Sequence, residues 1–267
     1  PEILRDEVVG HEATRVFSDA KRMLQRVIEG RWLQAHGVFG LYPANTIHDD
    51  DIAFYADESR AEPPLMVWHG LRMQTERPVI DGVKRPNRCL ADFVAPRGVK
   101  PDYAGMFAVS IQGVEHKEAQ FLADHDDYSA IMLKSLADRL AEAAAEWLHM
   151  RVRTHYWGYA FDEELDHDAL INEQFKGIRP APGYPACPDH TAKRELFALL
   201  DAPNNAGMTL TESCAMMPAA AVSGFFIGHP AASYFAIPKI GRDQLEDWAK
   251  RKGMSVKDAE YWLAPLL

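Results

Sequence analysis

The sequence GIRPAPGYPACPDHT, residues 177–191, contains four prolines between positions 180 and 188. Proline fixes φ and lacks a backbone donor, so this stretch can be neither a helix interior nor a central strand. Each proline also pushes the preceding residue toward extended geometry, which predicts a stiff, extended track. The track carries Arg179, whose planar guanidinium suits a carboxylate or phosphate, together with Gly183 and Tyr184. Two interpretations are open: a rigid surface connection, or a preformed surface for a ligand.

The composition of the 267-residue chain is that of an ordinary globular protein, with 47% hydrophobic and 25% charged residues. Its formal net charge of −10 disfavours general binding to nucleic acid or to anionic membranes, which calls for a basic surface. Cys89, Cys187 and Cys214 have no metal-ligand spacing, which indicates a reducing, cytoplasmic compartment. The sequence has no run of about 18 apolar residues that would predict a membrane span. We therefore expect a cytoplasmic protein with no nucleic-acid or membrane partner.

The longest predicted helix covers residues 127–156, and Asp126 or Asp127 is a suitable N-cap for it. Its predicted apolar stripe consists of Ile131, Leu136, Leu140, Trp147, Leu148 and Val152. Further helices are predicted over residues 6–29, 162–175, 191–200 and 244–252, and a last one begins at Ser255.

Strands are predicted over residues 38–45, 52–55, 65–68, 103–111, 222–227 and 234–237. Hairpins mixed with segregated helices indicate an α+β fold with an antiparallel sheet, rather than alternating β-α units. The sequence has no repeat and no long linker, so residues 1–267 are predicted to form one domain.

Two polar features invite a functional reading. His48 stands beside Asp49, Asp50 and Asp51, but neighbouring residues on a strand point to opposite faces, so a solvated turn is favoured over a metal site. Glu142 lies among alanines of the long helix, where the residues alone favour a solvated carboxylate over a ligand contact. The sequence contains no phosphate-binding glycine loop and no G-x-S-x-G nucleophile motif.

The R-x-x-x-G-Y pattern of residues 179–184 resembles the S-adenosylmethionine-binding motif in the C-terminal reactivation domain of cobalamin-dependent methionine synthases. The resemblance extends in order along nearly the whole chain. It includes DEVVG at 6–10, YPAN at 42–45, LRMQTE at 71–76, LADFVAP at 90–96, HDDY at 125–128, ADRLAE at 137–142, LTES at 210–213 and RKGMSV at 251–256.

The resemblance implies a C-shaped single α+β domain with a twisted antiparallel sheet, along which S-adenosylmethionine lies extended. Such a domain docks on the cobalamin-binding domain and presents the sulfonium methyl group to inactive cob(II)alamin, while flavodoxin or a flavoprotein reductase supplies the electron. The whole enzyme, a methyltransferase of methionine biosynthesis, transfers a methyl group from methyltetrahydrofolate to homocysteine. The isolated domain is not expected to catalyse methionine synthesis.

The resemblance also assigns roles to residues. It implies a site for S-adenosylmethionine formed by Arg179, Ala181, Glu142, Tyr234 and Phe235, with Tyr184 and Gly183 close to the cobalamin. It implies no catalytic side chain and no metal ligand in this domain. For Tyr234 and Phe235, packing in a core is the alternative role.

Family members carry an I-D-W segment upstream, whose aspartate also contacts S-adenosylmethionine. The matched region begins after that segment, so we expect the N-terminal part of the domain to lie outside these 267 residues. An alternative function follows: an interaction module that docks the cobalamin domain or flavodoxin without binding S-adenosylmethionine. A third hypothesis, an unrelated enzyme built on the 49–51 aspartates, has little support.

Overall fold

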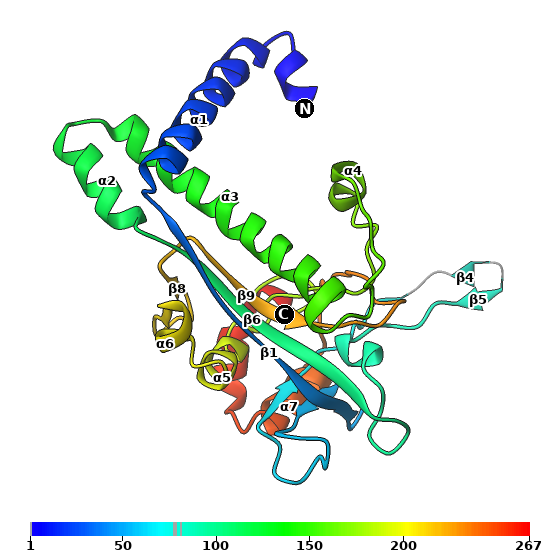
Figure 1. Cartoon of the computed structure of the whole chain (residues 1–267). Coiled ribbons are helices and arrows are strands. Elements are labelled where there is room, and N and C mark those ends of the chain that lie inside the picture. The colour runs from blue at the N-terminus through cyan, green and yellow to red at the C-terminus, as the bar shows by residue number, and fades with distance from the viewer. Residues whose placement is uncertain (1, 77–78, 81) are drawn as a thin grey trace.

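A computed structural model describes residues 2–76, 79–80 and 82–267 of the protein. Its centre is a curled five-stranded antiparallel sheet in the order β3-β2-β1-β6-β9 (Figure 1). These strands are β1 (Gln34–Ile47), β2 (Asp51–Phe54), β3 (Met66–His69), β6 (Asp102–Gln112) and β9 (Ala221–Phe226). Two small two-stranded sheets pair β4 (Val79–Ile80) with β5 (Val83–Lys84), and β7 (Thr209–Leu210) with β8 (Met216–Met217).

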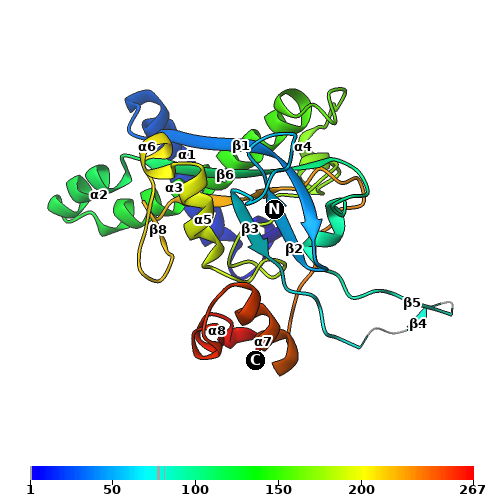
Figure 2. The same cartoon turned by 90° about the horizontal axis from the view of Figure 1, so that it is seen from below.

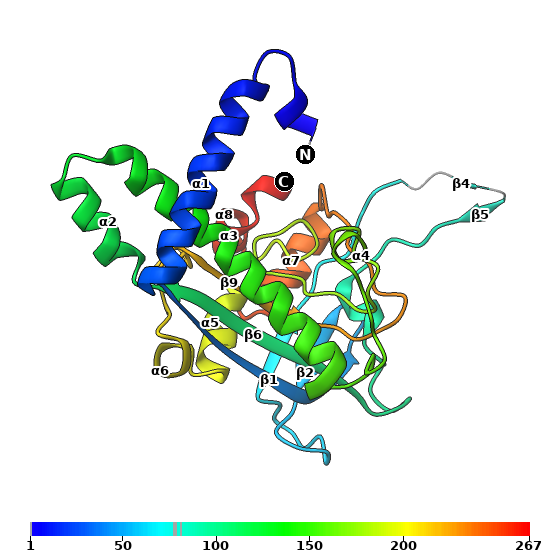
Figure 3. The same ribbon diagram turned by 45° about the horizontal axis from the view of Figure 1, so that its top comes forward.

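The helices lie around this sheet. They are η1 (Glu2–Arg5), α1 (Gly10–Gly30), η2 (Leu90–Phe93), α2 (Val114–Ala123), α3 (Asp127–Arg151), the π-helical turn η3 (Val152–Tyr156), α4 (His167–Ile171), α5 (Ala192–Leu199), α6 (Ala202–Ala206), α7 (Arg242–Arg251), α8 (Val256–Trp262) and η4 (Ala264–Leu266). Helix α1 packs near the start of α3 and extends away from the sheet (Figure 3). Within the described ranges, the helices lack an apolar stretch that would reach across a bilayer.

The sheet is covered on both faces, and the alternation of side chains along β6 shows why. Phe107 and Val109 point to one face, where they pack with Phe226 and with Ala145 of α3. The rings of Phe107 and Phe226 stack with their centroids 4.6 Å apart. Successive strand residues point to opposite faces, so Met106 and Ala108 belong to the other layer.

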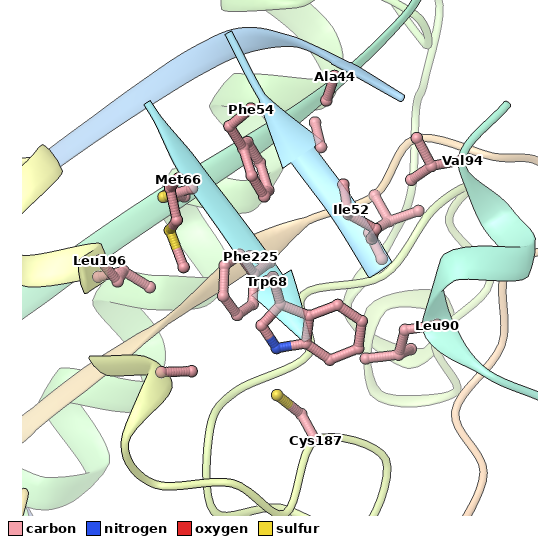
Figure 4. Packing of buried hydrophobic residues seen from close by; sticks show 14 of the residues in the cluster. Ala44, Ile52, Phe54, Met66, Trp68, Leu90, Val94, Cys187, Leu196 and Phe225 are labelled. Atoms are coloured by element: carbon pink, nitrogen blue, oxygen red, sulfur yellow. The ribbon is translucent and has the colours of Figure 1, made fainter. Parts of the chain in front are cut away.

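That second layer is the largest core cluster of the described chain, and it lies between the sheet and helices α5 and α6 (Figures 2 and 4). Trp68 of β3 packs there against Phe225 of β9, with ring centroids 5.9 Å apart. Cys187 lies below Trp68 (Figure 4), so the end of the predicted proline track is part of this core. Helices α7 and α8 form a third cluster around the fully buried Trp248.

The predicted α+β fold with an antiparallel sheet is confirmed, and α3 begins where expected. The Asp126 side chain accepts a hydrogen bond of 3.0 Å from the backbone N–H of Ser129. The predicted stripe of α3 is partly wrong, because Ile131 and Trp147 are exposed. The helix instead turns small residues to the protein, among them Ala137, Ala141 and Ala145, which lets it lie close to its neighbours.

Two further elements were predicted wrongly. Only His167–Ile171 of the predicted helix 162–175 is helical, since Glu173 takes a positive φ of 52°. Residues 234–237 form no strand, because the edge of β9 is already occupied. Ile178 pairs there with Ile227, and the Ile237 N–H donates to Pro185 O at 2.9 Å instead.

The aspartates at 49–51 are not simply a solvated turn, as the sequence suggested. Asp51 is 1% exposed and pairs with Arg251 and with His69, whose Nδ1 is 2.9 Å from Asp51 Oδ2. Asp50 accepts a 2.8 Å hydrogen bond from Nε of Arg72. These pairs join the start of β2 to α7 and to the segment after β3. Among the residues that the structure describes, no group of three His, Cys, Asp or Glu side chains forms a possible metal site.

Replacement of Asp51 by asparagine should destabilise the protein by about 2 kcal/mol, because the half-buried Arg251 keeps only Asp247 as an ion-pair partner and His69 loses its carboxylate. Urea denaturation measures this effect. Asp49→Asn, on the exposed turn, is the matched control and should change the free energy of unfolding by less than about 0.5 kcal/mol. Equal effects of the two substitutions would contradict a role for the buried pair.

Candidate functional site

The proline track is held against the edge of β9 by backbone hydrogen bonds. The Ile178 N–H donates to Ile227 O at 2.9 Å, and the Ile227 N–H donates back to Ile178 O at 3.0 Å. Pro180 has no N–H, but its carbonyl accepts from the Phe225 N–H at 2.9 Å. At Gly224 a Cβ would stand 2.5 Å from Pro180 O, so only glycine permits this approach.

After this pairing the track makes a tight turn. The Tyr184 N–H donates to Ala181 O at 3.1 Å, and the Gly183 N–H donates to Cys187 O at 2.7 Å. Gly183 has a φ of 101°, and a Cβ there would lie 2.2 Å from the ring of His190. This turn leaves the Tyr184 side chain 55% exposed at the surface.

A cavity of about 570 Å³ lies beside the track, within the size range of small-molecule sites. It is bounded by the track, by Glu142 of α3 and by the segment 234–236. Its lining residues are Glu142, Glu173, Arg179, Pro180, Ala181, Tyr184, Pro185, Ala186, Cys187, Val222, Tyr234, Phe235 and Ala236.

Six of the seven residues singled out from the sequence therefore line one cavity: Glu142, Arg179, Ala181, Tyr184, Tyr234 and Phe235. The seventh, Gly183, lines a neighbouring cavity of about 350 Å³, next to Trp262 of α8. Tyr184 borders both. Phe235 also packs against two core clusters, so its core role and its place on the cavity wall coexist.

Tyr234 and Tyr184 form hydrogen bonds with the polar groups of the cavity wall. The backbone N–H of Arg179 donates to the Tyr234 hydroxyl at 3.0 Å, and the Tyr184 hydroxyl donates to Glu142 Oε1 at 3.4 Å. Burial raises the pKa of Tyr234, and burial together with the Glu142 charge raises the pKa of Tyr184. Both phenols therefore stay neutral at physiological pH and remain hydrogen-bond donors or acceptors.

Arg179 is held from the side of α3. Its Nη2 lies 2.5 Å from Glu146 Oε2, and its Nη1 lies 3.4 Å from Nδ1 of His149. His149 is fully buried, with its ring stacked on Phe226 at 5.3 Å. Burial, with contributions from Arg153 and Arg179, holds the pKa of His149 well below its usual value, so the imidazole is neutral.

Sequence analysis missed three polar residues of this region. Glu146 lies four residues after Glu142, and His149 lies three residues after Glu146. This helical spacing is the sequence signal that would have found them. Glu173 lines the cavity from an irregular segment, where no periodicity places a side chain.

The chain is similar both to a known protein family and to a solved structure. The model described as "Vitamin B12 dependent methionine synthase, activation domain" matches residues 1–253. The chain belongs to this family. The activation domain is similar over 100% of its length to a solved structure titled "Crystal Structure of the MetH Reactivation Domain bound to AdoHcy". The match has 52% sequence identity and a TM-score of 0.92, and it covers 81% of that other chain. The family predicted from the R-x-x-x-G-Y pattern is thereby confirmed.

Because His149 is buried and neutral, the free energy of unfolding of the domain depends on pH. The pKa of His149 is lower in the folded state than in the unfolded state. The contribution of this residue to the free energy of unfolding is therefore fully present above the unfolded pKa, near 6.5, and is lost as the pH falls below that value. Relative to His149→Gln, the wild type should lose about 1 kcal/mol more of its unfolding free energy per pH unit between pH 6 and pH 5. Urea titrations at several pH values measure the slope. His116→Gln, on exposed α2, is the control and should keep the wild-type slope.

Proposed function

We propose that the 570 Å³ cavity binds S-adenosylmethionine and presents its methyl group for the reductive methylation of cob(II)alamin. The observation that carries the proposal is the convergence of one guanidinium, two carboxylates, two phenols and an extended backbone on a single cavity. The similar solved structure supports it, since that reactivation domain is described as bound to AdoHcy, the demethylated form of this ligand.

The lining groups match the parts of S-adenosylmethionine. Arg179 suits the ligand carboxylate, and Glu142 suits its ammonium group. Ala181 suits an adenine edge, because its N–H donates to no backbone carbonyl of the described residues. Tyr234 and Phe235 offer aromatic faces to the sulfonium or to the adenine ring. Glu173 adds a second negative charge to the wall, which favours a ligand with two positive centres.

The face toward the cobalamin would be the rim of this cavity. Tyr184, 55% exposed, borders both cavities, and Gly183 forms the turn beside it. We place the cobalamin of a neighbouring domain against these two residues. When bound, cobalamin supplies the chemistry of methyl transfer. The residues of this chain orient the ligand and neutralise its charges, without a catalytic acid, base or metal ligand.

The wider role follows from the family. The chain would act within a cytoplasmic methionine synthase that makes methionine from homocysteine and methyltetrahydrofolate. Flavodoxin or a flavoprotein reductase would supply the reactivating electron, and residues 1–267 would form most of one reactivation domain.

A second candidate function is docking alone, on the cobalamin domain or on flavodoxin, without S-adenosylmethionine. One observation favours it: Arg179 is paired with Glu146, and Glu142 already accepts from Tyr184. Arg179 and Glu142 thus have partners within the chain, so a ligand has to compete with existing contacts.

Calorimetry with S-adenosylmethionine separates the two functions. We expect weak but measurable binding to the wild type. Arg179→Ala should weaken it at least about tenfold, because a hydrogen bond to a charged group contributes about 1.5–3 kcal/mol. Arg15→Ala, on the exposed face of α1, is the matched control and should leave binding unchanged. No heat of binding to the wild type would favour docking alone, and equal affinity of wild type and Arg179→Ala would refute the assigned site.

A further inference from the structure

Four polar residues of α3 and η3 form a row along one side of the helix. Glu142, Glu146, His149 and Arg153 follow one another at intervals of four, three and four residues, which places them on one face. Each contacts the segment 175–184: Glu142 meets Tyr184, Glu146 and His149 meet Arg179, and Arg153 meets Phe175.

Two guanidinium groups share one aromatic ring in this region. The Cζ atom of Arg153 is 4.2 Å from the ring centroid of Phe175, and that of Arg179 is 5.9 Å from the same centroid. Arg153 is fully buried and has its own carboxylate, since its Nε and Nη2 donate to Glu163 at 2.9 and 2.7 Å. Arg179 has a single ion-pair partner among the described residues, Glu146. The ion pair with Glu146 therefore anchors the Arg179 guanidinium to α3, as Glu163 anchors that of Arg153.

His149 fixes one further atom of Arg179. A guanidinium can only donate, so Nδ1 of His149 has to accept the bond from Nη1 and the ring proton resides on Nε2. Among the described residues, Nη1 of Arg179 contacts His149 and Nη2 pairs with Glu146, while Nε has no hydrogen-bond partner. The remaining donors are available to a ligand carboxylate at the cavity.

We propose that Glu146 is the positioning residue of Arg179: its carboxylate holds the guanidinium at the cavity wall through an ion pair, while His149 sets its orientation. The inference rests on the proposed function, in which Arg179 binds the carboxylate of S-adenosylmethionine. In the absence of the Glu146 charge, Arg179 loses its ion-pair partner on α3, and with it the geometry that the ligand requires. The loss of position outweighs the removal of a competing carboxylate, because the Arg179 side chain is only 19% exposed and keeps no other ion-pair partner among the described residues.

The test compares two ligands on the same variants. Glu146→Gln should weaken the binding of S-adenosylmethionine about tenfold, a coupling of the size expected for contacting charged groups. It should leave unchanged the binding of 5′-methylthioadenosine, which lacks the carboxylate and the ammonium group. Glu146→Asp, which keeps the charge on a shorter side chain, should recover part of the loss. Glu118→Gln is the matched control, since it removes the Glu118–Lys134 ion pair between α2 and α3, which lies outside the cavity lining.

The outcomes separate this inference from the proposed function. Absence of S-adenosylmethionine binding to the wild type would remove the proposed function. Wild-type binding that Glu146→Gln leaves equal or makes tighter would overturn the positioning role alone. Equal losses for both ligands would show that Glu146 merely supports the fold, and melting temperatures of the variants check this directly. If Glu146→Gln does not fold, Glu146→Asp carries the same comparison with a smaller expected loss of about threefold.

Discussion

Three backbone hydrogen bonds between the proline track and the edge of β9 determine how the rest of the site is arranged. They involve Ile178, Pro180, Phe225 and Ile227. These bonds place Arg179 between two fixed residues, directly opposite α3. They also occupy the edge on which residues 234–237 would otherwise pair, so that segment lies along the track and forms the other wall of the cavity. The close approach depends on Gly224, because any side chain there would meet Pro180.

The second requirement of the site is that a charged helix lies close to the sheet. Helix α3 achieves this with a buried row of small residues that includes Ala137, Ala141 and Ala145. The carboxylates of Glu142 and Glu146 therefore come within reach of Tyr184 and Arg179 on the track. Packing of the helix and the electrostatics of the cavity are thus consequences of the same short side chains.

The sequence predicted the proline track and most of the residues singled out at the cavity, but these two predictions had different grounds. The prolines of 180–188 restrict the backbone by themselves, so their extended geometry could be predicted locally. The roles of Glu142, Tyr234 and Phe235 came from family resemblance, because no local rule brings residues from three separate segments together. Two of the wrong predictions are that Ile131 is buried and that residues 234–237 form a strand. Both depend on which neighbouring segment packs on a helix face or pairs with a sheet edge. That competition is decided by tertiary contacts, which hydrophobic periodicity does not report.

The prolines of the track have a consequence for how molecules of this protein meet one another. An outer sheet segment with free N–H groups is a template on which another chain can add a strand, the first step toward polymerisation. Pro182 and Pro185 have no N–H, and the outward N–H of Arg179 already donates to the Tyr234 hydroxyl. Other residues at these two positions would restore free N–H groups at this border, on which a second chain could add a strand. The residues that stiffen the ligand wall therefore also protect the open end of the sheet from self-assembly.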